Sequence, residues 1–226
     1  MGLVPYHIVR IQWNYIQSHQ NCYAEYDRDL TYNNKKVGII ISGWPAVGKT
    51  TIALELAKEF NLKICNGGDI LKILAGDKGY VISGDDWWDT QEAKKFMNER
   101  KSNPSFDKEV DEKLLQIVNE GDVIITSYTL PWLTQGPIKF WLKGSQDNRA
   151  KRMANRDNIS FFEAREIIKM RDEENKQIYS NLYGFNFGID LDVFDFSLNT
   201  DLLNLDSLVG VSKYIIRNLG ISKTYT

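Results

Sequence analysis

The segment from Gly43 to Thr50 constrains this chain more than any other part of it. It reads Gly-Trp-Pro-Ala-Val-Gly-Lys-Thr, follows the apolar run 37–41 and precedes the helix-like stretch 51–60. A strand, a glycine-bounded loop and a helix in this order form a P-loop, whose backbone N–H groups and helix N-terminus face a bound anion. The segment therefore predicts a nucleoside triphosphate site, with a glycine-rich turn that binds nothing as the alternative.

The residue types in this loop also predict individual roles. Lys49 can reach the β- and γ-phosphates, and the hydroxyl of Thr50 is a candidate ligand for Mg²⁺. The residues expected to bind the nucleotide are Gly43, Trp44, Pro45, Ala46, Val47, Gly48, Lys49, Thr50 and Thr51.

Composition limits the other classes of partner. The chain has 226 residues, 42% of them hydrophobic, which is enough for one sizeable domain. A formal net charge of −2 gives no overall basic field, so neither nucleic acid nor a membrane is an expected partner. Cys22 and Cys65 are far apart and lack metal-ligand spacing, which favours a reducing compartment. Without a membrane-length apolar run or a signal peptide, we expect a cytoplasmic location.

The chain divides into two parts by its residue pattern. Residues 1–36 are rich in Tyr, Asn, Gln and His with weak periodicity, and we interpret them as an N-terminal extension. Such an extension could be a regulatory or oligomerising arm, a disordered tail, or the product of an upstream start site. Residues 37–226 are expected to form the P-loop domain.

Short apolar runs alternate with longer helical patterns from residue 37 onward, which predicts an α/β fold with a five-stranded parallel sheet between two layers of helices. The expected strands are 37–42, 62–65, 122–126, 138–142 and 194–198. The expected helices are 49–60, 69–77, 90–101, 104–120, 145–156, 160–182 and 203–219. Asn103-Pro104 and Ser160 with Glu163 mark two helix starts, and Gly121 marks a helix end.

The two helices expected at 145–156 and 160–182 are rich in basic residues. Two arginine-bearing helices joined by a short turn could close as a lid and place cations over a phosphoryl group in transfer. The alternative is a solvated surface, neutralised by the acidic residues of the second helix. The basic residues are Arg149, Lys151, Arg152, Arg156, Arg165, Lys169, Arg171 and Lys176.

Three further segments could contact an acceptor. Asp69 follows two glycines and could cap the next helix or face a substrate, with Lys72 one turn later. Asp85, Asp86 and Trp87 belong to a run whose indoles could sandwich a base, or instead anchor the core. Tyr128 follows a predicted strand at the sheet edge that borders the ligand crevice, where ordinary loop packing is the alternative.

The order of these parts resembles that of the nucleoside monophosphate kinases, and most closely the archaeal-type cytidylate kinases. The motifs that carry the resemblance lie at 41–43, 48–51, 68–70, 106–111, 138–143, 149–152, 171–174, 179, 183–184 and 198–200. The fold of these kinases is the P-loop three-layer α/β/α fold with a helical lid. The resemblance implies that ATP and Mg²⁺ are bound, that the γ-phosphoryl group passes to CMP or dCMP, and that Asn199 and Thr200 lie against the donor adenine.

The resemblance also implies the catalytic residues. Lys49 would stabilise the transferred group, Arg152 and Arg156 would belong to the lid, and Arg171 would reach the phosphates between donor and acceptor. The sequence departs from the family where arginines grip the acceptor phosphate: Lys72, Tyr128 and Ile178 stand at those positions. Neither Tyr128 nor Ile178 can replace a guanidinium, which indicates an altered acceptor site.

Three functions remain open from the sequence. The first is a nucleoside monophosphate kinase of the cytidylate type. The second is a kinase on the same scaffold whose acceptor is a different small molecule, a hydroxyl compound without a phosphate. The third is a regulatory nucleotide-binding protein or slow NTPase that switches contacts with a partner.

Overall fold

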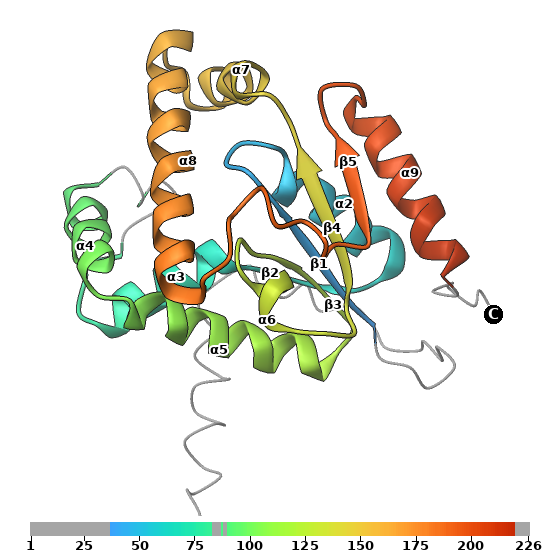
Figure 1. The fold of residues 1–226 in the computed structure, drawn as a ribbon, viewed down its shortest axis with the longest axis horizontal. Coiled ribbons are helices and arrows are strands. Elements are labelled where there is room, and N and C mark those ends of the chain that lie inside the picture. The colour runs from blue at the N-terminus through green and yellow to red at the C-terminus, as the bar shows by residue number, and fades with distance from the viewer. Residues whose placement is uncertain (1–36, 83–86, 88–89, 220–226) are drawn as a thin grey trace, which may run out of the picture.

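The computed structural model describes residues 37–82, 87 and 90–219 (Figure 1). The predicted extension, 1–36, lies outside the described residues, as do Asp85, Asp86 and Cys22. The division of the chain at residue 37 therefore stays a prediction.

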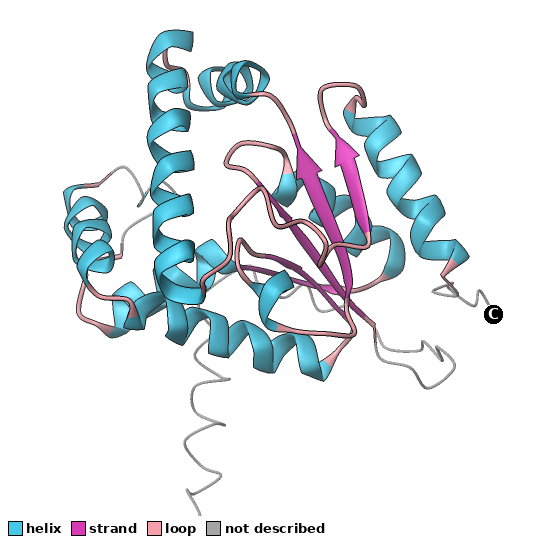
Figure 2. Ribbon diagram, in the orientation of Figure 1, coloured by secondary structure: helices cyan, strands magenta, loops and turns pink. Residues whose placement is uncertain are grey.

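A five-stranded sheet forms the centre of the described domain (Figure 2). The strands are β1 (Gly38–Gly43), β2 (Lys63–Asn66), β3 (Val123–Thr126), β4 (Ile138–Lys143) and β5 (Phe196–Asn199). They lie in the order β2-β3-β1-β4-β5, and every neighbouring pair is parallel. The predicted five-stranded parallel sheet is confirmed, with strand bounds that differ from the expected ones by two residues at most.

Helices cover both faces of the sheet because its central strands are apolar on both sides. The side chains of Ile39 and Ile41 pack on the face covered by α2 (Lys49–Phe60) and α9 (Leu205–Asn218). Ile40, between them in sequence, packs on the opposite face, with α3 (Gly67–Asp77), α4 (Gln91–Ser102) and α5 (Ser105–Glu120). The three-layer α/β/α architecture is thus confirmed.

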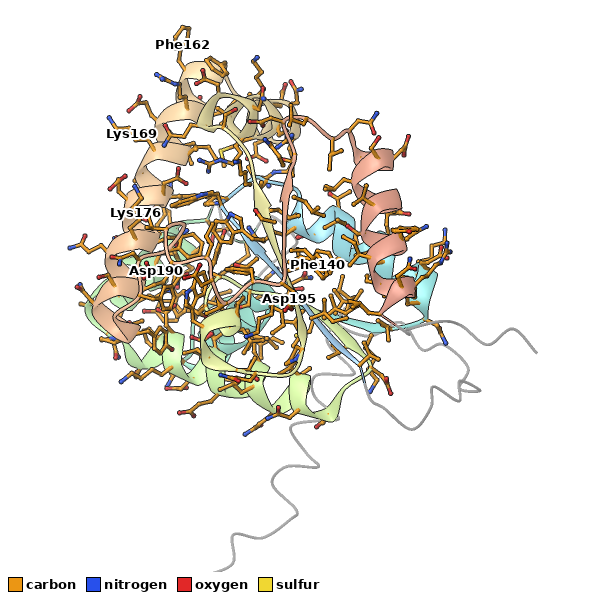
Figure 3. The ribbon with its side chains drawn as sticks, turned by 45° about the vertical axis from the view of Figure 1, so that its right-hand side comes forward. Phe140, Phe162, Lys169, Lys176, Asp190 and Asp195 are labelled. Atoms are coloured by element: carbon orange, nitrogen blue, oxygen red, sulfur yellow. The ribbon has the colours of Figure 1, made fainter. Side chains whose placement is uncertain are left out.

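Two helices stand beyond the carboxyl ends of β4 and β5 (Figure 1). They are α7 (Gln146–Asp157) and α8 (Phe161–Tyr183), which contact each other closely. Helix α8 runs from the level of α7 down to that of α5 (Figure 1). Phe162, 79% exposed, extends away from the domain at the outer end of α8 (Figure 3).

Most helix boundaries follow the predicted capping signals. At Asn103-Pro104 the start shifts by one residue, because α5 begins at Ser105 with Pro104 at the N-cap position and no side-chain cap. The hydroxyl of Ser160 accepts a hydrogen bond from Glu163 N, and α5 ends at Gly121, as expected. Helix α3 begins at Gly67, not at Asp69, because β2 leads into it directly; Asp69 lies in its first turn. The short helix α6 (Leu130–Leu133) was not predicted; the hydroxyl of Ser127 accepts hydrogen bonds from Thr129 N and Leu130 N there.

Among the described residues, no helix combines the length and the apolar composition that crossing a bilayer requires.

Candidate active site

The loop between β1 and α2 has the backbone shape that a phosphate cradle requires. Gly43 has a φ of +144°, and a Cβ there would lie 2.3 Å from the carbonyl oxygen of Leu142. Only glycine fits this position, so the first glycine of the motif is required by close packing against β4. Gly48 precedes the first turn of α2, whose backbone N–H groups face the loop.

Lys49 lies folded into its own loop. Its ammonium group donates hydrogen bonds of 2.9 Å to the carbonyl oxygens of Gly43 and Trp44. It also lies 4.4 Å from the centre of the Tyr128 ring. These contacts place the cation at the edge where β1 and β3 end, which is the expected position of the transferred phosphoryl group.

The surroundings of Lys49 disfavour its positive charge. Burial lowers its pKa to about 7, and the nearby Arg149 guanidinium acts in the same direction. An ammonium group that is short of counter-charge is prepared to bind an anion, because triphosphate oxygens would supply the missing negative charge.

Thr50 fits the predicted role of metal ligand. It is the second residue of α2, directly after Lys49, and it is exposed. In the described part of the chain, no cluster of three or more His, Cys, Asp or Glu side chains could hold a metal ion. A single hydroxyl with substrate phosphates and water suits Mg²⁺, which keeps several waters and uses few protein ligands.

A buried ion pair joins the two lid helices to the loop. The Arg149 guanidinium donates bidentately to Asp172, at 2.8 and 2.7 Å, and both side chains are less than 5% exposed. The same guanidinium donates to Pro45 O at 3.3 Å. Arg149 was expected on a basic helix face, but its charge is neutralised within the protein, where it holds α7, α8 and the P-loop together.

Trp44 is a second link between the loop and the lid. Its indole packs edge-on against Phe187 and Trp141, with centroid distances of 4.9 and 6.2 Å. Gly188 lies directly under it: a Cβ at Gly188 would fall 2.0 Å from Cζ2 of Trp44. The ring is therefore fixed between the P-loop, β4 and the segment that follows α8.

Arg152 joins the lid to the turn after β5. Its guanidinium donates to Thr200 Oγ1 at 3.0 Å and to Thr200 O at 2.6 Å. Thr200 N donates a hydrogen bond to Lys143 O, and the side-chain oxygen Oδ1 of Asn199 accepts one from Asp201 N. The structure thus brings together Arg152, Asn199 and Thr200, and it places Arg152 on the side expected for the donor base. Its reach to the phosphates stays a prediction.

Three other basic residues of the lid form ion pairs at the protein surface, and the ammonium group of Lys176 also lies 5.7 Å from the centre of the Trp44 ring. Arg156 pairs with Asp157, Arg165 with Asp147, and Lys176 with Glu173, and most of these side chains are more than 40% exposed. This part of the basic pair fits the solvated-surface alternative. Arg171 is exposed but close enough that its charge acts on Tyr128, so its predicted role is compatible with its position.

The acceptor side of Lys49 is aromatic. Tyr128 packs against Tyr179 and Phe187, with centroid distances of 6.1 and 5.7 Å, and burial raises its pKa. Ile178 packs with the same aromatic cluster. The phenol ring of Tyr128 and the alkyl chain of Ile178, at the two positions where the resemblance implies arginines, thus belong to one aromatic cluster.

The remaining acceptor candidates fall into two groups. Asp69 accepts a hydrogen bond of 2.8 Å from the side chain of Asn66, whose amide oxygen accepts one from the hydroxyl of Thr126. Asp69 therefore lies at the edge of the sheet where β2 and β3 end, and the half-buried Lys72 follows one turn later. Trp87, in contrast, is fully buried, packs against Phe96 and donates to Val81 O. Its position fits the core-anchor alternative, not a base sandwich.

One buried polar cluster near Tyr128 was not predicted from the sequence. Arg100 of α4 donates bidentately to Asp107 of α5, at 3.0 and 2.6 Å. One turn later, Asp111 accepts hydrogen bonds from Thr129 Oγ1 at 2.5 Å and from Tyr183 Oη at 2.6 Å. Asp107 and Asp111 lie within a motif that supports the family resemblance, but nothing in their spacing predicted Arg100 or Tyr183 as partners.

Burial raises the pKa of Asp111 to about 6, so the charged carboxylate is costly. Between the unfolded pKa near 3.8 and the folded value, the native protein holds the extra proton, and stability falls as pH rises. Over that range the loss is about 3 kcal/mol. Asp111→Asn should remove this loss, so chemical denaturation at pH 4 and pH 7 should show a smaller difference for the variant than for the unmodified protein. An unchanged difference would contradict the assignment.

Comparisons with known proteins agree with this geometry. Residues 38–202 match the model of the cytidylate kinase-like family. A protein named cytidylate kinase from Pyrobaculum islandicum is 33% identical over 187 residues, 81% of this chain and 95% of the relative. Another from Pyrococcus horikoshii is 29% identical over 185 residues, 81% of this chain and 90% of the relative.

Solved structures with similar folds are more distant in sequence. Shikimate kinase from Bacteroides thetaiotaomicron superposes with a TM-score of 0.52 at 15% identity, covering 82% of this chain and 99% of that one. An uncharacterized protein from Eubacterium ventriosum gives a TM-score of 0.58 at 17% identity, with 81% and 99% coverage. At this identity, the likeness establishes the fold only.

Proposed function

This chain belongs to the cytidylate kinase-like family, and from that premise we propose that it transfers the γ-phosphoryl group of ATP to the 5′-phosphate of CMP or dCMP. It is a phosphotransferase of the nucleoside monophosphate kinase type. The observation that carries the proposal is the position of Lys49, whose ammonium lies between the P-loop carbonyls and the ring of Tyr128 at the acceptor side.

The chain's own residues supply binding and charge, and the reaction requires little else. The backbone N–H groups of the loop hold the donor phosphates, and Lys49 moves from the loop carbonyls to the oxygens of the transferred group. Thr50 would hold Mg²⁺, which supplies charge neutralisation of the donor phosphates when bound. Arg171, near the middle of α8, would add a guanidinium toward the phosphates between donor and acceptor.

Arg152, Asn199 and Thr200 define the side of the donor base. Because Arg152 is bonded to Thr200, the guanidinium is oriented beside the turn at which we expect the adenine. A planar guanidinium can stack on an aromatic base as well as bind phosphate. The proposed donor site therefore runs from this turn to the P-loop.

The acceptor phosphate has fewer arginines than the family pattern provides. Lys72 and Lys49 can act as point charges, whereas Tyr128 offers a neutral hydroxyl because burial raises its pKa. We therefore expect a higher KM for the monophosphate than an enzyme with the full set of arginines would have.

An acceptor panel tests the proposal. We expect ADP formation from ATP and Mg²⁺ to be stimulated strongly by CMP or dCMP, and not in Lys49→Met. The assay should cover ribo- and deoxyribonucleoside monophosphates, together with the corresponding nucleosides. If ATP binds but no monophosphate stimulates turnover, the proposal is wrong.

A second candidate acceptor is a hydroxyl compound without a phosphate. The observation that favours it is the aromatic packing of Tyr128 and Ile178 at the positions of the missing arginines. Stimulation by a nucleoside, and not by its monophosphate, would identify this function. ATP hydrolysis that no acceptor changes would instead favour a regulatory NTPase.

The remaining expectations concern partners and location. We propose nucleotides as the substrates, with neither nucleic acid nor membrane as a partner. The cytoplasmic location, inferred from the cysteine pattern and from the lack of a membrane-length apolar run or a signal peptide in the sequence, stays a prediction.

A further inference from the structure

The cluster of Arg100, Asp107, Asp111, Thr129 and Tyr183 has no role in the phosphoryl transfer described above. We call it the Asp111 cluster. Its members come from α4, α5, the β3–α6 segment and α8, and two of its hydrogen bonds, from Thr129 and Tyr183, end on Asp111. Thr129 directly follows Tyr128 in the chain, so the cluster borders the proposed acceptor site.

The charge of this cluster is unbalanced. Arg100 and Asp107 neutralise each other through two hydrogen bonds, and their side chains are about 10% exposed. Asp111, 4% exposed, accepts hydrogen bonds from two neutral hydroxyl groups, those of Thr129 and Tyr183. One net negative charge therefore lies beside the acceptor site, where it would repel a phosphate and attract a hydrogen-bond donor.

A ligand could more easily replace one of the two hydrogen-bond donors to Asp111 than the other. Thr129 is buried at the strand end and its segment is fixed by the Ser127 cap. Tyr183 is half-buried, at the last residue of α8, so its hydroxyl reaches Asp111 from a partly open side. A donor group on a ligand could take over the hydrogen bond that Tyr183 donates.

We propose that Asp111 recognises the exocyclic amino group of the acceptor base, accepting at Oδ2 the hydrogen bond that Tyr183 donates in this structure. This inference rests on the proposed function and adds the residue that selects the base. Cytosine presents an amino donor at this position of its ring, whereas uracil presents a carbonyl acceptor. A carboxylate binds the first and repels the second, because two acceptors cannot form a hydrogen bond.

The first test compares CMP with UMP in Asp111→Asn. An asparagine keeps the shape and can present either an oxygen or an amino group, so we expect the ratio of kcat/KM for CMP over UMP to fall about 100-fold. The change should come mainly from KM. Glu109→Gln is the matched control, since Glu109 lies on the same helix and pairs with Lys78 at the surface; its ratio should not change.

Tyr183→Phe gives a second, independent test. If the tyrosine hydroxyl competes with the substrate, removing it should lower KM for CMP about threefold and leave KM for UMP unchanged. A purely structural role for Tyr183 predicts instead that both KM values rise together. This variant also carries the test if Asp111→Asn fails to fold.

The outcomes separate this inference from the proposed function. Turnover of CMP by the unmodified enzyme, with an unchanged CMP over UMP ratio in Asp111→Asn, would overturn the assignment of Asp111 and leave the kinase function intact. Failure of the unmodified enzyme on every monophosphate would overturn both. A loss of discrimination in Asp111→Asn, with a lower KM for CMP in Tyr183→Phe, supports the assignment.

Discussion

Replacing Lys49 with methionine should lower kcat about 1,000-fold, because the variant lacks the cation that stabilises the transferred group. The ammonium group is the cation of the P-loop, and its 2.9 Å contacts with Gly43 O and Trp44 O hold it next to the phosphate position. Methionine keeps the unbranched stem and removes only the charge and the donors. Initial rates at saturating ATP and acceptor measure the effect.

Lys58→Met is the control for this change. Lys58 lies at the other end of the same helix and is exposed, so its replacement should leave kcat within about twofold. Residual activity in Lys49→Met above about a tenth of the original would contradict the role of Lys49 in stabilising the transferred group.

The same variant has a predicted pH signature. Lys49 is protonated below pH 10.5 in the unfolded chain but only below about pH 7 in the folded protein. Between these values the unfolded state binds the extra proton, so stability rises with pH. From pH 7 to pH 9 this group should add about 2 kcal/mol to the free energy of unfolding. Denaturation at the two pH values should show that increment in the unmodified protein and not in Lys49→Met.

Breaking the ion pair between Arg149 and Asp172 should have the largest effect on stability. Both side chains are almost completely buried, so removal of one partner leaves the other charge in a poorly solvated position. We expect Asp172→Ala to lower the free energy of unfolding by about 3–5 kcal/mol. Because Arg149 also donates to Pro45 O, KM for ATP should rise as the loop loses that support.

A second pair between the same two helices serves as the control. Arg165 and Asp147 also join α8 to α7, but these side chains are 50% and 61% exposed. Removing Asp147 should therefore cost less than about 1 kcal/mol. Equal losses in Asp147→Ala and Asp172→Ala would show that burial does not determine the strength of these pairs. Replacing Arg149 and Asp172 together with apolar residues should restore much of the lost stability.

The sequence predicted the features that depend on local patterns. The strand, loop and helix around Lys49 follow one another in the chain, so motif and periodicity together located the P-loop. The central strands are apolar on both faces, which is typical of a covered parallel sheet and led to the correct layers. The acceptor roles assigned from single segments were predicted less well. A tryptophan such as Trp87 looks the same in the sequence whether it stacks on a base or fills the core, and here it is fully buried.

Features that depend on distant parts of the chain were not predictable in this way. Arg149 and Asp172 are 23 positions apart, and spacing alone placed the arginine on a basic surface. Asp111 meets Thr129 and Tyr183 only after α5, α6 and α8 have packed, 18 and 72 positions away. The polar contacts that distinguish this site from a generic P-loop are therefore tertiary, and a single sequence carries little trace of them.

The close contact between Trp44 and Gly188 has an evolutionary consequence. Any side chain at position 188 would collide with the indole, and the backbone there has a φ of +82° that disfavours other residues. Trp44 and Gly188 should therefore vary together: lineages that keep the tryptophan keep the glycine, and a smaller residue at 44 must come first before position 188 can change. A glycine 144 positions away in the sequence therefore restricts the order in which mutations at these two positions can be accepted.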